Sequence, residues 1–139
     1  MAREREFFTV VDDQTANPTL ALDLAVATCK IIRKLQHMTP KEIEDVCGIY
    51  HACNYGSCSK YDLARYIVSN DICSHEHVVS TIVPVSSDQF PTPAKRPMFS
   101  ALYTGKFAET FGFSLPSWKN SLSKELYYYG LAKQIKRMA

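Results

Sequence analysis

The sequence has few glycines, and they are scattered. It contains five among 139 residues, at positions 48, 56, 105, 112 and 130. A dinucleotide site needs several glycines at one strand-to-helix turn, and a P-loop needs a G-x-x-x-x-G-K-[S/T] run. Neither pattern occurs, so we expect no ordinary NAD(P)-binding turn within this chain. The one Tyr-x-x-x-Lys match, Tyr129 with Lys133, has no such turn nearby and predicts a surface i,i+4 pair.

An excess of one charge and long apolar runs are also missing. The formal net charge is +2, so no strong field attracts nucleic acid or an anionic membrane. No apolar run approaches the roughly 20 residues that cross a bilayer. The charged start MAREREFF is not followed by the apolar region of a secretory signal. We therefore expect a cytoplasmic protein with neither nucleic acid nor a membrane as partner.

The cysteines lack the spacing of a disulfide framework or a zinc site. Five is an odd number, and reduced thiols fit this kind of chain better than disulfides. Cysteine and histidine gather in one region without a C-x-x-C pair, and their spacings match no closed tetrahedral site. The residues concerned are Cys47, His51, Cys53, Cys58, Cys73, His75 and His77. Cys58 is a weak candidate nucleophile, because only His51 is at hand as a base.

Strands alternate with helices along the chain. Short apolar, β-branched runs predict strands at 7–11, 49–54 and 80–86. Apolar periodicity and capping residues predict helices at 20–35, from Ser59 to about Val68, at 104–111 and from Ser117 toward Lys136. We expect Thr19 to cap the first helix, Gly112 to end the third, 40–48 to be a polar linker and 55–59 to be a turn. The pattern predicts an α/β fold with a small, partly parallel sheet and flanking helices, as part of a larger fold.

Two loops carry the candidate binding residues. Asp12, Asp13 and Gln14 follow the first predicted strand, and α/β ligand sites lie beyond the carboxyl ends of strands. Arg96 lies in a loop stiffened by three prolines between residues 91 and 97, and its guanidinium suits bidentate phosphate contact. Residue type alone supports equally a structural arginine that holds the loop through carbonyl oxygens.

Three segments resemble one enzyme family, in its order and spacing. TPAKRPMFSALYTGKF and FGFSLPSWKNSL resemble the C-terminal substrate-binding segment of dTDP-4-dehydrorhamnose reductases, with its PTPA-basic-RP-x-x-S-x-L loop and LPxW. VVDDQTANPTLALDLA and IYHACNYGSCSKYDLARYI are similar to two further motifs of that family. The resemblance runs from Glu4 to about Leu126. It implies a single RmlD-like substrate-binding domain over 1–139, the C-terminal half of an extended short-chain dehydrogenase (NAD(P)-binding Rossmann-type) fold.

The resemblance also accounts for what is missing. The family's N-terminal half carries the glycine-rich turn and the Tyr-x-x-x-Lys pair, and this chain is expected to begin after both, as a truncated frame, a fragment or half of a split protein. We therefore expect no catalytic residue, no activity by itself and no cofactor bound by this chain alone, although the intact family uses NAD(P)H.

For the binding site, the resemblance implies a dTDP-sugar ligand. Arg96 would face the diphosphate, Lys95 would add positive field, and Asp13, Gln14 and Thr19 would lie near the cavity wall. Some family members bind magnesium at a dimer contact. Glu125 matches one acidic position, but Leu22 stands where another carboxylate is expected, so we predict no metal.

Two further residues are interpreted through the resemblance. Asn17 stands where the family usually has glycine, and asparagine tolerates left-handed backbone better than most residues. Trp118, the only tryptophan, is expected to anchor the last helix in the core.

The implied function is the substrate-binding part of an NAD(P)H-dependent reductase that makes dTDP-L-rhamnose. The alternatives are a non-catalytic nucleotide-sugar-binding or regulatory protein of the same superfamily, as the regulatory beta subunit of methionine adenosyltransferase is, or a non-functional truncated remnant. Without the cofactor half, Phe7, Phe8 and the helix at 20–35 would lose their partner. We therefore expect either a separate N-terminal half or self-association.

Overall fold

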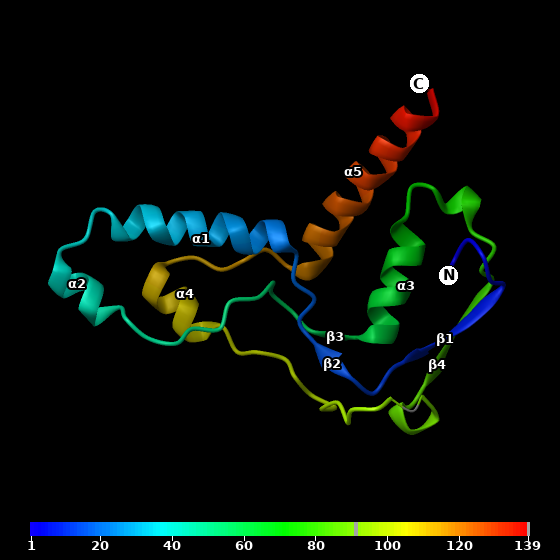
Figure 1. The fold of residues 1–139 in the computed structure, drawn as a ribbon, viewed down its shortest axis with the longest axis horizontal. Coiled ribbons are helices and arrows are strands. Elements are labelled where there is room, and N and C mark those ends of the chain that lie inside the picture. Colours follow the sequence, from blue (N-terminus) through cyan, green and yellow to red (C-terminus); the bar gives the residue numbers. More distant parts are fainter. Residues whose placement is uncertain (91, 139) are drawn as a thin grey trace.

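The structure is a computed structural model that describes residues 1–90 and 92–138. In chain order its main elements are β1 (Phe7–Val11), β2 (Thr15–Ala16), α1 (Ala21–Leu35), α2 (Pro40–Asp45), β3 (Cys58–Ser59), α3 (Lys60–Asn70), β4 (Thr81–Val85), α4 (Gly105–Phe111) and α5 (Trp118–Met138). Figure 1 shows them spread along one axis, with α1, α2 and α4 at one end and β1 and β4 at the other. In the described part of the chain, no helix is both long and apolar enough to cross a membrane.

The sheet end is built on one parallel strand pair. β1 and β4 run side by side in the register Phe7↔Thr81 to Val11↔Val85. α3 lies between them in sequence and contacts both strands. The expected α/β class with a small, partly parallel sheet is confirmed. The short β2 and β3 pair antiparallel beside it and lead the chain toward the helical end.

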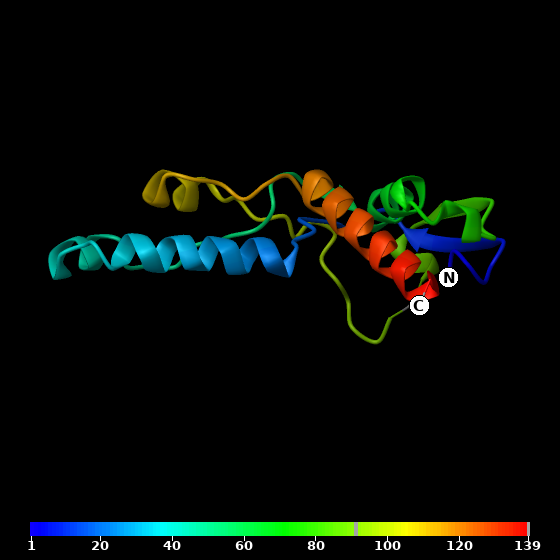
Figure 2. The same cartoon turned by 90° about the horizontal axis from the view of Figure 1, so that it is seen from above.

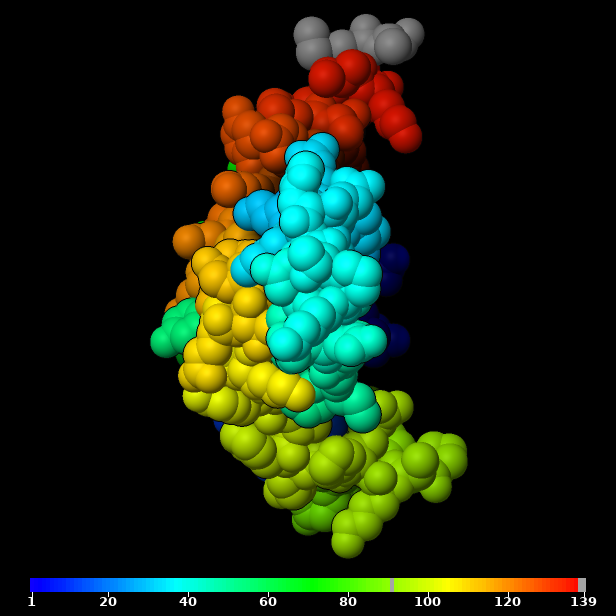
Figure 3. Space-filling model, turned by 90° about the vertical axis from the view of Figure 1, so that its left-hand side faces the viewer, coloured from blue at the N-terminus to red at the C-terminus, as the bar shows by residue number. Residues whose placement is uncertain are grey.

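The helical end holds the apolar core. Ala27 on α1 packs against Phe107 and Phe111 on α4 and against Leu115. The rings of Phe107 and Phe111 lie 5.2 Å apart, centroid to centroid, at 54°. Figure 2 shows α1 lying alongside α4 when the molecule is seen from above. Figure 3 looks onto this end, where the cyan side chains of α1 and α2 lie against the yellow ones of α4.

The last turns of α5 are fastened to the sheet end by charge. Glu76, in a 3-10 turn before β4, forms an ion pair with Arg3 (Nε to Oε2, 2.6 Å) and also with Lys133 and Arg137 of α5. Asp71 pairs with Arg3 as well, at 3.0 Å. Lys133 therefore bonds across the fold, and not to Tyr129 in the i,i+4 pair that its spacing predicts. We call this group of charged side chains the Glu76 cluster.

Most predicted helices, and the first and last predicted strands, are confirmed. Ser59 caps α3, its hydroxyl oxygen accepting from the backbone N–H of Asp62 at 3.0 Å. Ser117 caps α5 in the same way, with Asn120 N–H as donor at 3.3 Å. Gly112 ends α4 with φ of 78°, a left-handed conformation that glycine adopts without steric cost.

Three local predictions are wrong. Residues 49–54 form no strand, although their composition favours one. The region at 40–48 is not only a linker, because Thr39 and Glu42 form a capping box that starts α2. The segment at 55–59, expected to be only a turn, ends in β3.

Thr19 does not cap α1. Its hydroxyl donates to the carbonyl oxygen of Asn17 at 3.1 Å, and the helix begins after Leu20 without a side-chain cap. The Leu20 N–H donates instead to the side-chain oxygen of Asn54, at 2.8 Å. A side chain 34 positions away in sequence therefore holds the residue before α1, although no side chain caps the first turn of the helix.

Candidate functional site

The polar residues predicted after β1 lie at the carboxyl end of the parallel pair. Because β1 and β4 are parallel, the loops that follow them leave the same edge of the sheet. The Asp12 N–H donates to Val85 O at 2.9 Å. The Asp13 carboxylate accepts from both the N–H and the hydroxyl of Ser87, at 2.8 and 2.5 Å. These bonds join the two loops into one rigid rim.

Ser87 is the residue at this rim that the sequence did not single out. Its hydroxyl donates to Asp13 and also accepts from the side-chain nitrogen of Gln14, at 2.9 Å. The two hydrogen bonds from Ser87 lower the pKa of Asp13 below its usual value. Lys60 at the start of α3 donates to the Gln14 oxygen at 2.6 Å. The rim thus presents a fixed carboxylate and a fixed amide.

Arg96 and Lys95 lie beside this rim. A cavity of about 650 Å³ is lined by Asp13, Gln14, Ser87, Asp88, Phe90, Thr92, Pro93, Ala94, Lys95, Arg96 and Met98. A second hollow, of about 310 Å³, shares Gln14 and Arg96 and adds Lys60 and Ser100. We call these two adjoining hollows the rim cleft. Pro91, one of the three prolines predicted to stiffen the loop, lies outside the described residues.

Both cations of the loop are exposed. No hydrogen bond or ion pair within residues 1–90 and 92–138 involves the side chain of Lys95 or Arg96. The carbonyl contacts expected of a structural arginine therefore do not occur in this part of the chain. The donors of the Arg96 guanidinium are therefore not used by any acceptor in the described part of the chain.

Asn17 anchors the end of the proline loop. Its side-chain oxygen accepts from Leu102 N–H at 2.7 Å, and its nitrogen donates to Gly56 O at 2.9 Å. Thr15 bonds to Met98 and Ser100 through its backbone, at 2.8 and 2.9 Å. No non-glycine residue in the described ranges has a positive φ, so Asn17 does not use the left-handed backbone that asparagine tolerates. Its side chain ties together three segments instead.

Thr19, the fifth predicted binding residue, is placed elsewhere. Its hydroxyl oxygen accepts from the Asn54 N–H at 3.3 Å, at the start of α1. It lines neither hollow of the rim cleft. The structure thus brings together Asp13, Gln14, Lys95 and Arg96, and separates Thr19 from them.

Asn54 is the hub that sequence reasoning missed. Its side chain is fully buried, with 0% exposed. The amide nitrogen lies within hydrogen-bond distance of Asp23 (2.7 Å), Pro116 O (2.9 Å) and Ser121 (3.1 Å), so its two N–H donors are shared among three acceptors. These bonds join α1, the 54–56 segment and the start of α5. An asparagine between two apolar segments gives no local signal of this role, because its partners are distant in sequence.

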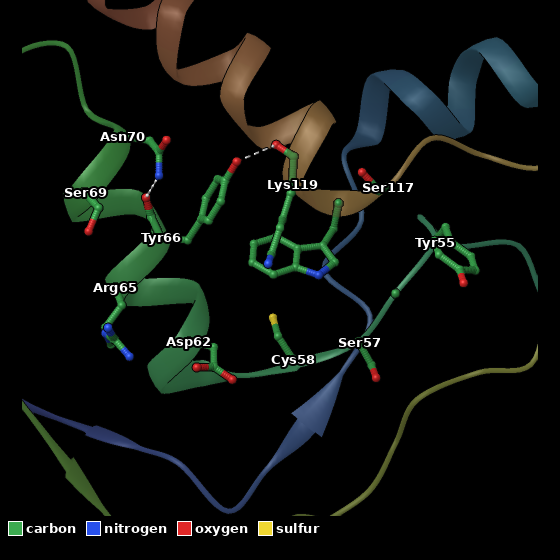
Figure 4. Close-up of a pocket in the computed structure, with 12 residues that line it drawn as sticks. Tyr55, Ser57, Cys58, Asp62, Arg65, Tyr66, Ser69, Asn70, Ser117 and Lys119 are labelled. Atoms are coloured by element: carbon green, nitrogen blue, oxygen red, sulfur yellow. Dashed lines mark hydrogen bonds between the residues drawn. The ribbon is translucent and has the colours of Figure 1, made fainter.

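A separate hollow lies between α3 and the start of α5 (Figure 4), with a volume of about 610 Å³. Trp118 meets Tyr66 edge-on at 5.1 Å between ring centroids. The expectation that Trp118 anchors the last helix is confirmed, since only 6% of it is exposed. None of the predicted binding residues lines this hollow.

The same hollow contains the candidate nucleophile. Burial, with Asp62 adding to it, raises the pKa of Cys58 to about 11. At neutral pH this sulfur is therefore a protonated thiol, which is a poor nucleophile. The arrangement does not support covalent catalysis by Cys58.

The cysteine and histidine residues do not assemble around a common centre. Cys47 is exposed, whereas Cys53 and Cys73 are buried. His77 hydrogen-bonds to Asp71, Nε2 to Oδ2 at 2.9 Å. Within the described ranges, no three histidine, cysteine or acidic side chains come close enough to hold a metal ion.

Polar loops at the ends of parallel strands, with a basic loop over them, define an α/β ligand-binding domain. Comparison with known proteins narrows this class. The chain belongs to the RmlD substrate binding domain family, which matches residues 1–129. The resemblance found in the sequence is therefore confirmed.

Named relatives agree with this assignment. The chain is 35% identical over 123 residues to a dTDP-4-dehydrorhamnose reductase of Sinorhizobium fredii, covering 87% of this chain and 40% of that protein. It is 32% identical to the reductase of the same name from Escherichia coli K12, covering 91% of this chain and 41% of the relative. The chain thus spans about 40% of the length of these relatives.

Solved structures give the same result. A dTDP-4-dehydrorhamnose reductase from Clostridium acetobutylicum is similar at a TM-score of 0.72 and 30% identity, over 88% of this chain and 39% of the other. The reductase from Bacillus anthracis, solved in complex with NADP, is similar at a TM-score of 0.67 and 34% identity, over 88% and 38%.

Proposed function

We propose that this chain is the nucleotide-sugar-binding part of a dTDP-4-dehydrorhamnose reductase and that its ligand is a dTDP-sugar. The observation that carries the proposal is the meeting of Asp13, Gln14 and Arg96 at the rim cleft. In that cleft an arginine with uncommitted donors stands beside a carboxylate and an amide that other residues hold in place.

The chemistry of the cleft suits a diphosphate joined to a sugar. A guanidinium donates two parallel hydrogen bonds to a phosphate, and Lys95 adds positive charge from the same loop. The side-chain amide of Gln14 donates one N–H to the Ser87 hydroxyl, and its oxygen accepts from Lys60. Its second N–H is therefore available to the ligand. Asp13 stays ionised because its pKa is lowered, so it offers an acceptor for sugar hydroxyls.

Reduction of the sugar would require a second portion of protein. NAD(P)H supplies the hydride when it is bound, and this chain has no glycine-rich turn for it. The role of this chain is to hold and orient the sugar. The sheet end suits such an arrangement, because Phe7 and Val83 on one face of the β1–β4 pair are exposed, whereas parallel sheets are normally covered on both faces. The cofactor-binding portion, or self-association, would cover that face.

Ligand binding tests the proposal directly. A ligand that binds only the folded state raises its melting temperature, and at ten times the dissociation constant it stabilises by about 1.4 kcal/mol. We expect dTDP-rhamnose to raise the melting temperature of the chain and of Arg65→Ala, but not of Arg96→Ala. Arg65 is the matched control because it is exposed and lines the separate hollow. An equal rise in Arg96→Ala would contradict the assigned site.

Catalysis is tested by a fusion. The Sinorhizobium fredii reductase is cut where its match to this chain begins, and its C-terminal portion is replaced by residues 1–139. We expect the fusion to oxidise NADPH in the presence of dTDP-4-dehydrorhamnose, and Arg96→Ala to weaken this. A folded fusion that binds dTDP-rhamnose but shows no turnover would support the non-catalytic alternative.

A further inference from the structure

Lys60 is a third cation of the rim cleft, beside Lys95 and Arg96. It is the first residue of α3, directly after the Ser59 cap. Its ammonium group donates to the Gln14 side-chain oxygen at 2.6 Å. The same side chain lines the smaller hollow of the cleft, of about 310 Å³, together with Arg96. Two cations from distant parts of the chain therefore border one hollow.

The position of Lys60 in its helix is unfavourable by local physical chemistry. A helix carries a partial positive charge at its N-terminus, where acidic side chains stabilise it and basic ones destabilise it. Asp62 in the first turn of α3 has the favourable sign, whereas Lys60 has the opposite one. The lysine is exposed and makes no ion pair in the part of the chain that the structure describes. The helix itself therefore gains nothing from this charge.

The two hollows of the rim cleft differ in charge. The larger hollow is lined by two cations and two carboxylates: Lys95, Arg96, Asp13 and Asp88. Its formal charges therefore cancel. The smaller hollow is lined by Lys60 and Arg96, and no carboxylate occurs among the described residues around it. Because cations attract a diphosphate and carboxylates repel it, the smaller hollow is the better place for one.

Lys60 has donors to spare for a phosphate. An ammonium group carries three N–H donors and can turn them toward different acceptors. Gln14 takes one of them, and the Lys60 side chain makes no other hydrogen bond within residues 1–90 and 92–138. The contact with Gln14 also holds the ammonium at the rim, so less ordering remains when a ligand binds. Lys60 can thus keep Gln14 in place and bind a phosphate oxygen at the same time.

We propose that Lys60 is the second phosphate-binding cation of the rim cleft and that the diphosphate lies in the smaller hollow, between Lys60 and Arg96. The inference rests on the proposed function and adds a ligand-binding residue to it. Arg96 supplies two parallel donors and Lys60 a compact charge, as these residue types do at phosphates. Lys95, on the larger hollow, contributes only a screened attraction.

Charge-removing variants test the assignment through affinity. Titration calorimetry measures the binding of dTDP-rhamnose to the chain and to each variant. We expect Lys60→Met to bind at least about 10-fold more weakly, which corresponds to one lost charge-assisted hydrogen bond. Lys60→Arg keeps the charge and should stay within about 3-fold of the wild type, and Lys95→Met should weaken binding by no more than about 3-fold.

Lys41→Met is the matched control, because Lys41 is an exposed lysine near the start of another helix, α2, and lines neither hollow. It should bind like the wild type. Equal weakening in Lys60→Met and Lys95→Met would overturn the placement of the diphosphate in the smaller hollow.

A double-mutant cycle separates phosphate binding from a purely positioning role. If Lys60 acted only by holding Gln14, Lys60→Met would have no further effect in a Gln14→Ala chain. We expect it to weaken binding by at least about 5-fold in that background too. Affinity should also fall more steeply with salt in the wild type than in Lys60→Met, because salt screens one more charge contact. No further loss in the Gln14→Ala chain, or an identical salt dependence, would overturn the proposal.

These variants should fold, because substitutions at exposed residues such as Lys60 seldom destabilise a protein. Circular dichroism checks each one. If Lys60→Met does not fold, Lys60→Gln replaces it, since it also removes the charge and keeps a polar side chain at the start of α3.

The outcomes separate the two proposals. If Arg96→Ala loses dTDP-rhamnose and Lys60→Met binds like the wild type, the proposed function stands and the role of Lys60 is overturned. If UDP-glucose binds as tightly as dTDP-rhamnose and both depend on Lys60, the phosphate site stands and the dTDP-sugar assignment is overturned. A folded chain that binds neither sugar nucleotide overturns both.

Discussion

The two ends of the molecule are held together by different interactions. At the helical end, aromatic rings of α4 are buried against α1, and Phe107 is only 2% exposed. At the sheet end, Phe7 begins β1 with 65% of its surface exposed, and the Glu76 cluster fastens α5. Burial of apolar area stabilises the first end by several kcal/mol per large side chain. Partly exposed ion pairs contribute much less.

This difference indicates which end can stand alone. The helical end has an apolar core within this chain, and Asn54 joins it to the start of α5. The sheet end has two parallel strands with one face uncovered, and an isolated strand pair is marginal in water. The candidate ligand residues lie on the sheet end, so the proposed ligand binding would depend on the end with less apolar core of its own. The following variants test this contrast.

Phenylalanine truncation at the two ends should give the largest difference. We expect Phe107→Ala to lower the free energy of unfolding by about 4 kcal/mol, because it leaves a cavity beside Phe111. Phe7→Ala removes an exposed ring and should change that free energy by less than about 0.5 kcal/mol. Urea denaturation of both variants measures this. Comparable losses would mean that the sheet end is as tightly packed as the helical end.

Removal of the hub should have the next largest effect. Asn54→Ala leaves the Leu20 N–H without its partner and removes one of the donors to the Asp23 carboxylate, which keeps only the bond from Ser121, and this should cost about 3 kcal/mol of folding free energy. Asn120→Ala, an exposed position on α5, is the matched control and should be nearly neutral. Thermal unfolding followed by circular dichroism checks both. A stable Asn54→Ala variant would show that the network around Asn54 does not join the two ends.

Acid should weaken the sheet end through the Glu76 cluster. The hydrogen bond from Lys133, with burial opposing it and Arg137 and Arg3 adding to it, lowers the pKa of Glu76. A carboxyl whose pKa is lowered on folding stabilises the fold above its unfolded pKa, and this stability is lost as pH falls through the folded pKa. We therefore expect the melting temperature to fall below about pH 4.5, the ordinary range for glutamate.

The variant Glu76→Gln should reduce this acid dependence and slightly lower the melting temperature at pH 7. Glu109→Gln, at an exposed residue of α4, serves as control and should keep the wild-type pH profile. Thermal melts between pH 3 and pH 7 compare the three proteins. If Glu76→Gln retains the full acid dependence, other carboxylates control the stability of this end.

Several parts of the fold could be predicted because their signals are local. The 3.6-residue periodicity at 20–35 marks α1, and hydroxyl caps at Ser59 and Ser117 mark the starts of α3 and α5. Short apolar runs mark β1 and β4. Their parallel pairing then follows from the helix between them, and it places Asp13 and Gln14 beyond the strand ends.

Other features depend on partners that are distant in sequence. Ser87 is one of many serines until the pairing of β1 with β4 brings it to Asp13. Thr19 is a residue type that commonly caps helices. In the structure, however, the Asn54 side chain accepts from the Leu20 N–H at the start of α1, and the Asn54 N–H donates to the Thr19 hydroxyl. Such competition between hydrogen-bond partners cannot be read from neighbouring residues.

The sequence by itself determined the elements with their own periodicity and caps, the absence of a glycine-rich turn, and Arg96 in a proline-rich loop as a candidate. Only the tertiary structure decided that Arg96 meets Gln14 at one cleft, that Asn54 joins three segments, and that residues 49–54 form no strand. The physical reason is the range of the interactions. A helix satisfies its hydrogen bonds within one turn, whereas a strand, a hub or a binding cleft exists only where distant segments meet.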